Sequence, residues 1–217
     1  MIVPGDIQRR NAVEAAAPHS DIPGLELLRA YADVFVDAHR RAPGGLSIEI
    51  GTRRGGSALL WLWLIDIMYQ GAPRPVLFTV DPYGDKAYNG GDVVGGHFYG
   101  DEHYLAAKAL LAGYPNHAHF LMTSLTFLGR MRGMSYWRRG EHRHAGEKDV
   151  TFAFLDGEHD VSTVNDELGW LWDNWMREGS LVLIDNVSND PATRPFLEEA
   201  YKVDQITEQY AVISGRK

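Results

Sequence analysis

Hydrophobic residues recur along the chain at two spacings, one typical of helices and the other typical of strands. Residues 25–41 and 161–175 repeat apolar side chains at helical spacing, which predicts an amphipathic helix in each segment. Residues 57–69 are apolar around most of the helical circumference, so this helix is expected to be buried on more than one side. Further helices are predicted over 103–111, from about residue 125, and over 191–201.

Short apolar segments lie between the predicted helices. Residues 46–50 alternate apolar and polar side chains, while 76–80 and 150–155 are mainly apolar, as in strands at the centre of a sheet. Other strands are predicted over 119–122, 181–184, 205–207 and 210–214, the last two as an antiparallel pair. Because strand and helix alternate, the sequence predicts a Rossmann-like α/β fold. Its doubly wound, mostly parallel seven-stranded sheet would carry helices on both faces and an antiparallel C-terminal strand.

Three segments show no clear periodicity. Residues 1–24 contain several prolines and are expected to form a loose lead-in, so that 1–45 would precede a main domain at 46–217. Residues 82–101 are rich in Gly and Tyr, and loops of this length usually belong to functional sites or to disorder. Residues 130–148 form a locally basic insertion that also contains aromatic residues. Both of these segments are expected to influence substrate choice.

Composition narrows the function classes. The 217 residues include no Cys, which removes disulfides, thiolate metal sites and cysteine nucleophiles and makes the reducing cytoplasm the simplest location. The net charge of -8, from 21 Lys and Arg against 29 Asp and Glu, opposes nucleic-acid binding. No apolar run approaches the ~20 residues of a membrane span, and the N-terminus lacks the pattern of a signal peptide.

Polar and glycine residues follow the predicted strands one after another. In open α/β sheets, ligands bind outside the carboxyl ends of the strands. The residues at these positions are Gly51 to Ser57, Asp81 and Tyr83, Thr123 and Ser124, Asp156, Glu158 and His159, and Asp185 and Asn186. A purely structural α/β domain would not require carboxylates at so many strand ends, so the sequence predicts one ligand site along this edge.

The turn after the first strand has the spacing Gly-x-x-x-Gly. Gly51 and Gly55 permit positive φ and close approach of the backbone to a ligand, although a tight strand-to-helix turn alone would explain them. Glu49 lies just before the turn, where its carboxylate would orient the loop or a ligand amine. Asp81, at the end of the second strand, suits two ribose hydroxyls; the alternative is an Asx turn before Pro82.

Asp156, Asp185 and Asn186 form the most specific group. Adjacent strands lie about 4.8 Å apart, so these residues would bring two carboxylates and an amide together as oxygen ligands for Mg²⁺. The alternatives are that Asp156 caps the next helix and that Asp185 and Asn186 begin a turn. His159 follows closely and suits a general base, with a histidine hydrogen-bonded at a helix N-terminus as the alternative.

Taken together, these segments resemble class I S-adenosylmethionine-dependent methyltransferases. EIGTRRGGS (49–57) resembles the motif whose glycine turn approaches the methionine part of the cofactor. VDPYGD (80–85) resembles the motif whose acidic residue binds ribose, and FLMTSLTFL (120–128) resembles the lining of the adenine pocket. The resemblance implies a cofactor site made by Glu49, Gly51, Thr52, Gly55, Ser57, Asp81, Thr123 and Ser124.

Two further segments resemble a narrower branch, the metal-dependent small-molecule O-methyltransferases. They are FLDGEHDVSTVNDELGW (154–170) and LIDNVS (183–188). The branch includes macrocin-type and aminocoumarin methyltransferases, with catechol O-methyltransferase as a more distant relative, and its sequence group also contains proteins named for cephalosporin hydroxylase. The resemblance implies methyl transfer to a hydroxyl of a small molecule, with Mg²⁺ held by Asp156, Asp185 and Asn186. His159 would take the proton, at the place where catechol-type enzymes carry a lysine.

Other functions fit the same residues. A metal-dependent hydrolase or hydroxylase would use Asp156, His159 and Asp185 without a methyl donor, and a non-catalytic protein of this fold would bind a partner through residues 130–148. A nucleic-acid methyltransferase fits less well, because the Asn/Asp-Pro-Pro-Tyr/Phe signature of amino-methylating DNA enzymes is absent. The apolar helix at 25–41 would support a homodimer.

Overall fold

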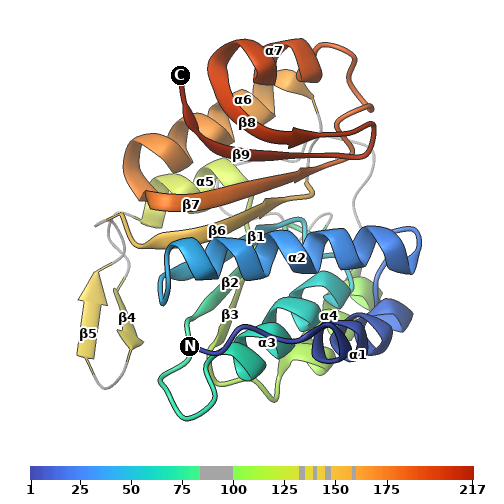
Figure 1. Cartoon of the computed structure of the whole chain (residues 1–217), viewed down its shortest axis with the longest axis vertical. Coiled ribbons are helices and arrows are strands. Elements are labelled where there is room, and N and C mark those ends of the chain that lie inside the picture. Colours follow the sequence, from blue (N-terminus) through green and yellow to red (C-terminus); the bar gives the residue numbers. More distant parts are fainter. Residues whose placement is uncertain (84–99, 132–134, 139–140, 145–147, 158–159) are drawn as a thin grey trace.

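A computed structural model of the chain describes residues 1–83, 100–131, 135–138, 141–144, 148–157 and 160–217 (Figure 1). Its centre is a seven-stranded sheet with the strand order β3-β2-β1-β6-β7-β9-β8. The strands are β1 (Leu46–Ile50), β2 (Leu77–Val80), β3 (His117–Phe120), β6 (Val150–Leu155), β7 (Met176–Asp185), β8 (Tyr201–Ile206) and β9 (Tyr210–Arg216).

The direction of the strands confirms the predicted fold class. Strands β3, β2, β1, β6 and β7 pair in parallel, whereas β9 is antiparallel to both of its neighbours, β7 and β8. Strand β8 therefore points the same way as the other five, and the C-terminal strand alone is reversed. The expected antiparallel pair at the C-terminus is also confirmed.

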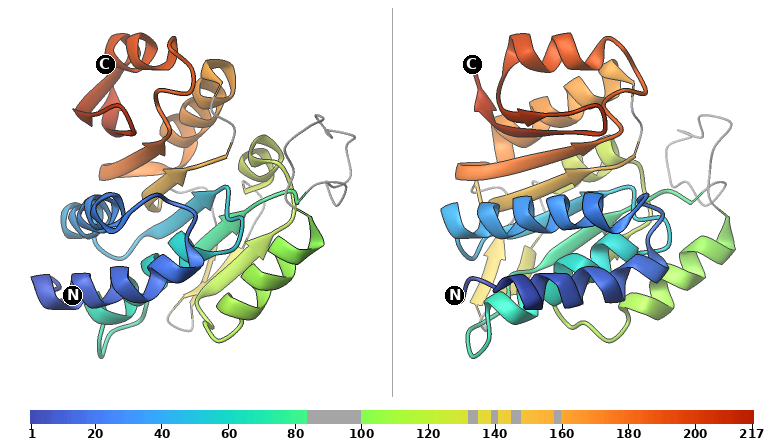
Figure 2. Two further views of the ribbon diagram at one scale, coloured as in Figure 1. Left: turned by 90° about the vertical axis from the view of Figure 1, so that its right-hand side faces the viewer. Right: turned by 45° about the vertical axis from the view of Figure 1, so that its right-hand side comes forward.

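Helices cover both faces of the sheet (Figure 1 and Figure 2). One face carries α1 (Asp6–Ala16), α2 (Leu25–Arg41), α3 (Gly56–Met68) and α4 (Asp101–Leu111), and the other carries α5 (Ser124–Arg130), α6 (Val161–Trp170) and α7 (Thr193–Ala200). Side chains alternate between the faces along each strand: Phe152 and Phe154 pack under the first group of helices, and Ala153 and Leu155 pack under the second.

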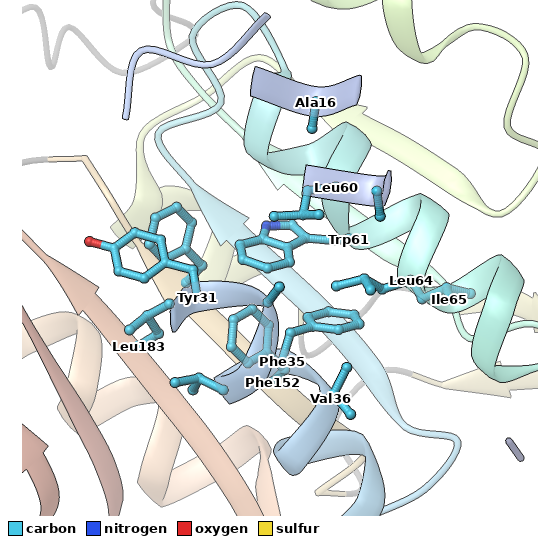
Figure 3. Packing of buried hydrophobic residues seen from close by; sticks show 14 of the residues in the cluster. Ala16, Tyr31, Phe35, Val36, Leu60, Trp61, Leu64, Ile65, Phe152 and Leu183 are labelled. Atoms are coloured by element: carbon cyan, nitrogen blue, oxygen red, sulfur yellow. The ribbon is translucent and has the colours of Figure 1, made fainter. Parts of the chain in front are cut away.

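An aromatic cluster fills the space between α2, α3 and the sheet (Figure 3). Phe35 of α2 stacks on Trp61 of α3 with ring centroids 5.0 Å apart and an interplanar angle of 14°. Phe152 of β6 meets both rings edge-on, at 4.9 Å from Phe35 and 5.2 Å from Trp61. Such offset and edge-to-face pairs add about 0.5–1.5 kcal/mol each beyond the burial of their area. The helix at 57–69 is buried on several sides, as its composition predicted.

The N-terminal segment differs from the prediction. Residues 1–24 are not a loose lead-in, because they contain α1 and a 3₁₀ turn at Ala17–His19. Ala12, Val13 and Ala16 are buried and join the same hydrophobic cluster as α2 and α3. The prolines do not interrupt α1, since Pro4 precedes it and Pro18 lies in the 3₁₀ turn, where a proline near the start of a helix is tolerated.

Several element boundaries also differ, those of α6 and β7 the most. The helix predicted over 161–175 is α-helical only to Trp170 and continues as a π-helical turn at Leu171–Trp175. Strand β7 begins at Met176 rather than at residue 181, and its pairing with β6 shifts register between Val150 and Phe152. The irregular pairing includes Gly179, which has a φ of 83°. Because the first residues of β7 pair irregularly, they do not alternate apolar and polar side chains, and the sequence pattern did not reveal them as part of the strand.

The basic insertion contains a two-stranded hairpin, β4 (Ser135–Arg138) and β5 (Glu141–His144). It lies in the connection between α5 and β6, and therefore at the end of the sheet where the parallel strands begin (Figure 1). The carboxyl ends of the strands lie at the opposite end of the molecule. The hairpin therefore lies away from that edge, and the expected influence of residues 130–148 on substrate choice stays a prediction.

Within the described part of the chain, no helix combines the length and the apolar character that crossing a lipid bilayer requires.

Candidate active site

The strands end level with one another. Val80, Ile50, Leu155 and Ile184 form an unbroken row of register partners across β2, β1, β6 and β7. The next residue of each strand is therefore Asp81, Gly51, Asp156 or Asp185, and these four residues form a second row at the carboxyl edge. The register confirms that the strand-end residues chosen from the sequence share one edge of the sheet.

The glycine turn after β1 needs its glycines for close packing. Gly51 has a φ of 90°, and a Cβ atom added to it would lie 2.0 Å from the carbonyl oxygen of Asp156. Gly55 has a φ of 85° and lies against Ala107 and Leu111 of α4. Both residues therefore adopt the positive φ that their spacing predicted, and the close approach visible in the structure is to neighbouring chain segments.

Thr52 lies inside this turn and is 2% exposed. Its hydroxyl oxygen is buried, and no residue of the described structure forms a hydrogen bond with it. A buried hydroxyl usually has a partner, because an unsatisfied polar group costs about 1–3 kcal/mol. The Thr52 hydroxyl is therefore a candidate contact for a ligand held by the turn.

Asp81 connects the end of β2 to the glycine turn. Its Oδ2 accepts a hydrogen bond from the Arg53 amide at 2.8 Å, and its Oδ1 accepts one from the Tyr83 amide at 3.0 Å. Tyr83 in turn donates its hydroxyl to the Arg53 carbonyl at 2.6 Å. Burial raises the pKa of Asp81, and the backbone amides that donate to it act in the opposite direction. The Asx turn considered from the sequence is thus present, and the same carboxylate also fixes the turn at Arg53.

Glu49 is fully buried beneath the turn, on the face of the sheet covered by α3. Ser57 donates its hydroxyl to Oε1 of Glu49 at 3.2 Å, and Trp61 donates its indole N–H to Oε2 at 2.6 Å. Burial raises the pKa of Glu49 to about 8, although both hydrogen bonds lower it. Glu49 and Ser57 therefore join β1 to the first turn of α3, which supports the predicted role of Glu49 in orienting the loop.

Asp156 and Asp185 lie side by side at the ends of β6 and β7. Their carboxyl groups are in hydrogen-bonding contact, and burial followed by the proximity of Asp185 raises the pKa of Asp156 well above its ordinary value. Asn186 has a φ of 54° and donates its amide to Oδ2 of Asp185 at 3.1 Å. The structure therefore brings together the two carboxylates and the amide that were predicted as one group.

The alternative roles of these residues can be compared with the structure. Asp160, not Asp156, caps α6, and its carboxylate accepts from the amides of Ser162 and Thr163 at 3.0 Å each. Asn186 does begin a turn, because its carbonyl accepts from the Asn189 amide at 2.9 Å. The backbone of Asn186 forms the turn and its side chain contacts Asp185, so the two roles are compatible.

Thr123 caps α5, and Ser124 is the first residue of that helix. The Thr123 hydroxyl donates to the Thr126 hydroxyl at 2.9 Å and accepts from the Thr126 amide at 3.4 Å. Both residues follow β3 at the same edge of the sheet. Their predicted contact with a cofactor stays a prediction.

His159 and Glu158 fall outside the described residues, and so does most of the segment 82–101. In the described part of the chain, no group of three or more His, Cys, Asp or Glu side chains has a geometry that would hold a metal ion. The predicted ligand set contains only two such residues, Asp156 and Asp185, with Asn186 as the third.

Sequence reasoning missed two residues that shape the site. Tyr31 of α2 is fully buried and donates its hydroxyl to Oδ1 of Asp185. Asp21 lies in the N-terminal segment and forms a 2.9 Å ion pair with Arg53 of the glycine turn. Because both residues belong to segments far from their partners in the sequence, no local pattern could have identified them.

The comparisons with known proteins agree with this geometry. Residues 48–187 match the methyltransferase domain family, a span that begins just before Glu49 and ends just after Asn186. No curated protein matches the chain in sequence at a significant level. Many solved structures match the fold.

Three of these structures illustrate the similarity. The O-methyltransferase TomG from Streptomyces achromogenes, involved in tomaymycin synthesis and solved with SAM, has a TM-score of 0.53 at 16% identity, covering 100% of this chain and 93% of that one. CalS11, a calicheamicin methyltransferase, has a TM-score of 0.57 at 14% identity, and the match covers 99% of this chain and 94% of CalS11. An O-methyltransferase from Bacillus cereus solved with SAH has a TM-score of 0.50 at 16% identity, and the match covers 99% of this chain and 93% of that enzyme.

At these identities the three structures show that the fold is shared with O-methyltransferases. The matched family segment covers well over half of the chain and contains the whole strand-end row. The chain therefore belongs to the methyltransferase domain family.

Proposed function

We propose that this methyltransferase transfers the methyl group of S-adenosylmethionine to a hydroxyl of a small molecule, with a divalent cation, Mg²⁺, held beside the cofactor. The observation that carries the proposal is the strand-end row. In this row the buried Asp81 lies beside the glycine turn, and the glycine turn lies beside the adjacent carboxyl groups of Asp156 and Asp185. A cofactor site and an oxygen-rich cation site would thus share one edge of the sheet.

The cofactor would lie across the carboxyl ends of β1, β2 and β3. Asp81 would accept hydrogen bonds from the ribose hydroxyls, and the turn at Gly51 to Gly55 would face the methionine part, where the Thr52 hydroxyl lacks a partner among the described residues. Glu49 and Ser57 would hold this turn, and Thr123 and Ser124 would lie near the adenine. SAM and SAH in the structures of TomG and the Bacillus cereus enzyme support this assignment.

The donor set at β6 and β7 fits a hard cation. Asp156, Asp185 and Asn186 offer carboxylate and amide oxygens, which Mg²⁺ prefers over nitrogen and sulfur. Two buried carboxyl groups in contact repel each other when both are charged, and a divalent cation would remove that repulsion. A bound cation would lower the pKa of an acceptor hydroxyl and so favour its reactive, deprotonated form.

The residues of this chain contribute mainly by holding the reactants in place. A rigid turn and a rigid carboxylate pair would fix the methyl donor and the acceptor oxygen in near-attack geometry, which can supply about 7–11 kcal/mol of the barrier reduction. His159 would accept the proton of the hydroxyl, since its ordinary pKa of about 6.5 suits a general base near neutral pH. The methyl acceptor would be a small molecule that binds at the carboxyl ends of the strands.

Titration calorimetry with S-adenosylhomocysteine tests the proposal. We expect the purified protein to bind this ligand and Asp81→Ala to bind it at least about tenfold more weakly, because a ribose contact to a charged group contributes about 1.5–3 kcal/mol. Asp173→Ala serves as the matched control, since Asp173 pairs with Arg216 on the surface away from the site. Absence of binding to the wild-type protein at millimolar ligand would overturn the proposal.

A further inference from the structure

The hydroxyl of Tyr31 reaches the carboxylate pair from α2, a helix that contributes no other residue to the site. We propose that Tyr31 is a positioning residue, which orients the Asp185 carboxylate so that this carboxylate and Asp156 bind a divalent cation together. The inference rests on the proposed cation site and adds a residue from outside the methyltransferase family segment at 48–187.

The ring of Tyr31 is held firmly in the core. Tyr31 is 0% exposed and packs edge-on against Phe154 of β6 and Tyr210 of β9, with ring centroids 5.5 Å and 5.3 Å away. Figure 3 shows the ring beside Leu183, with its oxygen pointing away from Trp61. Because the ring is confined on several sides, the hydroxyl has a defined position, and the side chain loses little entropy when it makes the hydrogen bond.

The two oxygens of Asp185 receive different donors. Tyr31 donates to Oδ1, and the Asn186 amide donates to Oδ2 at 3.1 Å. Each carboxylate oxygen can accept two hydrogen bonds or ligands, so one donor on each oxygen fixes the carboxylate plane without using all of its capacity. The carboxyl group of Asp156 contacts the same carboxylate. Asp185 is therefore clamped from both sides while it faces Asp156.

A tyrosine suits this role better than a charged donor would. Its hydroxyl donates one hydrogen bond and carries no positive charge, so it orients the carboxylate without repelling a cation or neutralising the negative charge that binds one. Groups that hydrogen-bond to metal ligands fix the ligand geometry, and replacing them typically weakens metal affinity by about 10–100-fold. A phenylalanine at this position would keep the core packing but would leave Oδ1 of Asp185 without its donor.

Electron paramagnetic resonance of Mn²⁺, whose free-ion signal falls on binding, provides the test. We expect Tyr31→Phe to raise the dissociation constant for Mn²⁺ by at least about tenfold while the affinity for S-adenosylhomocysteine stays the same. Tyr210→Phe is the matched control. It removes a hydroxyl from the neighbouring ring, and that hydroxyl accepts from the Gln205 amide at 2.7 Å instead of contacting an aspartate. We expect Tyr210→Phe to bind Mn²⁺ as the wild-type protein does.

The outcomes separate this inference from the proposed function. Equal Mn²⁺ affinity in Tyr31→Phe and the wild-type protein would overturn the role of Tyr31 and leave the cation site intact. A wild-type protein that binds S-adenosylhomocysteine but no Mn²⁺ would overturn the cation site and this inference together.

A second pair of variants covers the case in which Tyr31→Phe alone does not fold. Asp185→Asn removes the charge that Tyr31 would orient, so in the double variant Tyr31→Phe/Asp185→Asn the loss of the tyrosine hydroxyl leaves no charged group at position 185 without its donor. Because Tyr31 acts through Asp185, we expect the double variant to bind Mn²⁺ with the same affinity as Asp185→Asn. A further loss of affinity in the double variant would contradict the inference.

Discussion

Gly51 illustrates how a single position can be constrained twice. Its φ of 90° disfavours every other residue, and a Cβ atom there would lie 2.0 Å from the carbonyl oxygen of Asp156. The first constraint is local and the second comes from the neighbouring strand. Positions at the strand-end row therefore serve the packing of the sheet as well as any ligand, and the two roles can be separated by experiment.

We expect Gly51→Ala to lower the free energy of unfolding by about 2–4 kcal/mol, because non-glycine residues at such φ cost about 1–3 kcal/mol and the clash with Asp156 adds to this strain. Urea denaturation measures the change. Gly71→Ala is the control, since Gly71 has a φ of 72° but a Cβ atom there would meet no heavy atom within 4 Å. Its expected cost is about 1 kcal/mol. If the two variants lose the same free energy of unfolding, the close approach to Asp156 does not contribute to the destabilisation.

Glu49 is expected to make stability depend on pH. Its pKa is about 8 in the folded chain against an ordinary value of 4.5, so between these pH values the folded state holds a proton that the unfolded state has released. The unfolding free energy contributed by Glu49 therefore falls as pH rises through this window, by up to about 1.4 kcal/mol per pH unit, and is constant above it. Glu49→Gln mimics the protonated form and should remove this slope.

The stabilities of the wild-type protein and Glu49→Gln are best compared between pH 6.5 and pH 8. Burial lowers the pKa of His117 and His119 to about 4, so these residues stabilise the fold as pH rises from about 4 to 6.5 and contribute no slope above that range. Asp81 and Asp156 remain in both chains, but the charge of Glu49 also raises the pKa of Asp156. The slope that Glu49→Gln removes therefore includes a smaller share from Asp156. Parallel stability curves for the wild-type protein and Glu49→Gln above pH 6.5 would show that Glu49 does not titrate there.

At the scale of elements, α1 shows how tertiary packing makes a helix out of a weakly patterned segment. The segment contains few apolar residues, yet Ala12, Val13 and Ala16 all face α3 and the core. The residues that follow α1 also matter for the site. Asp21 pairs with Arg53, and the backbone of Ser20 lies within 2.4 Å of the Cβ position of Gly56. The N-terminal segment thus packs directly on the glycine turn.

We expect Val13→Ala to lower the unfolding free energy by about 2 kcal/mol, since Val13 is fully buried and the smaller side chain leaves a cavity between α1 and α3. Ile7→Ala on the same helix is the matched control, because Ile7 is 70% exposed, and its effect should stay within about 0.5 kcal/mol. Chemical denaturation of the two variants checks the difference. Similar values for both would mean that α1 is not docked on the core.

At the scale of the whole molecule, the site lies where the two halves of the sheet meet. The chain runs outward from β1 through β2 to β3, then returns to β6 on the other side of β1. This reversal of strand order creates a crevice at the carboxyl ends, the usual ligand position in open α/β sheets. The acidic residues Asp81, Asp156 and Asp185 stand at these ends. Charging Asp156 beside Asp185 costs electrostatic energy, and a bound cation would offset this cost.

We expect Asp156→Asn to raise the unfolding free energy of the cation-free protein by at least about 1 kcal/mol, because it removes one of two buried carboxyl groups in contact. If Mg²⁺ binds as proposed, it should raise the melting temperature of the wild-type protein, and the same change should abolish this increase. Thermal unfolding with and without Mg²⁺ measures both effects. Asp173→Asn is the control, because Asp173 belongs to a half-exposed surface ion pair. This variant should change neither the unfolding free energy nor the effect of Mg²⁺ on the melting temperature. A cation-free Asp156→Asn protein that is less stable than the wild type would contradict the expected repulsion.

Much of the fold and part of the site followed from local patterns. The helix at Leu25–Arg41 and the strands at Leu46–Ile50 and Val150–Leu155 have the predicted bounds, because hydrophobic periodicity and glycine or proline stops are properties of short segments. The juxtaposition of Asp156 and Asp185 also followed, since parallel neighbours end at the same edge. The bulged start of β7 did not, because its first residues pair irregularly.

The sequence by itself determined the strands of the main sheet, most of the helices, their order, and which polar residues stand at the strand ends, since each of these depends on neighbours within a few positions. The tertiary structure decided which distant residues meet. Tyr31 and Asp185 are 154 positions apart, and Gly51 meets the backbone of Asp156 only because β1 and β6 pair in register. Contacts of this kind depend on the register and crossovers of the complete sheet, which no local pattern encodes.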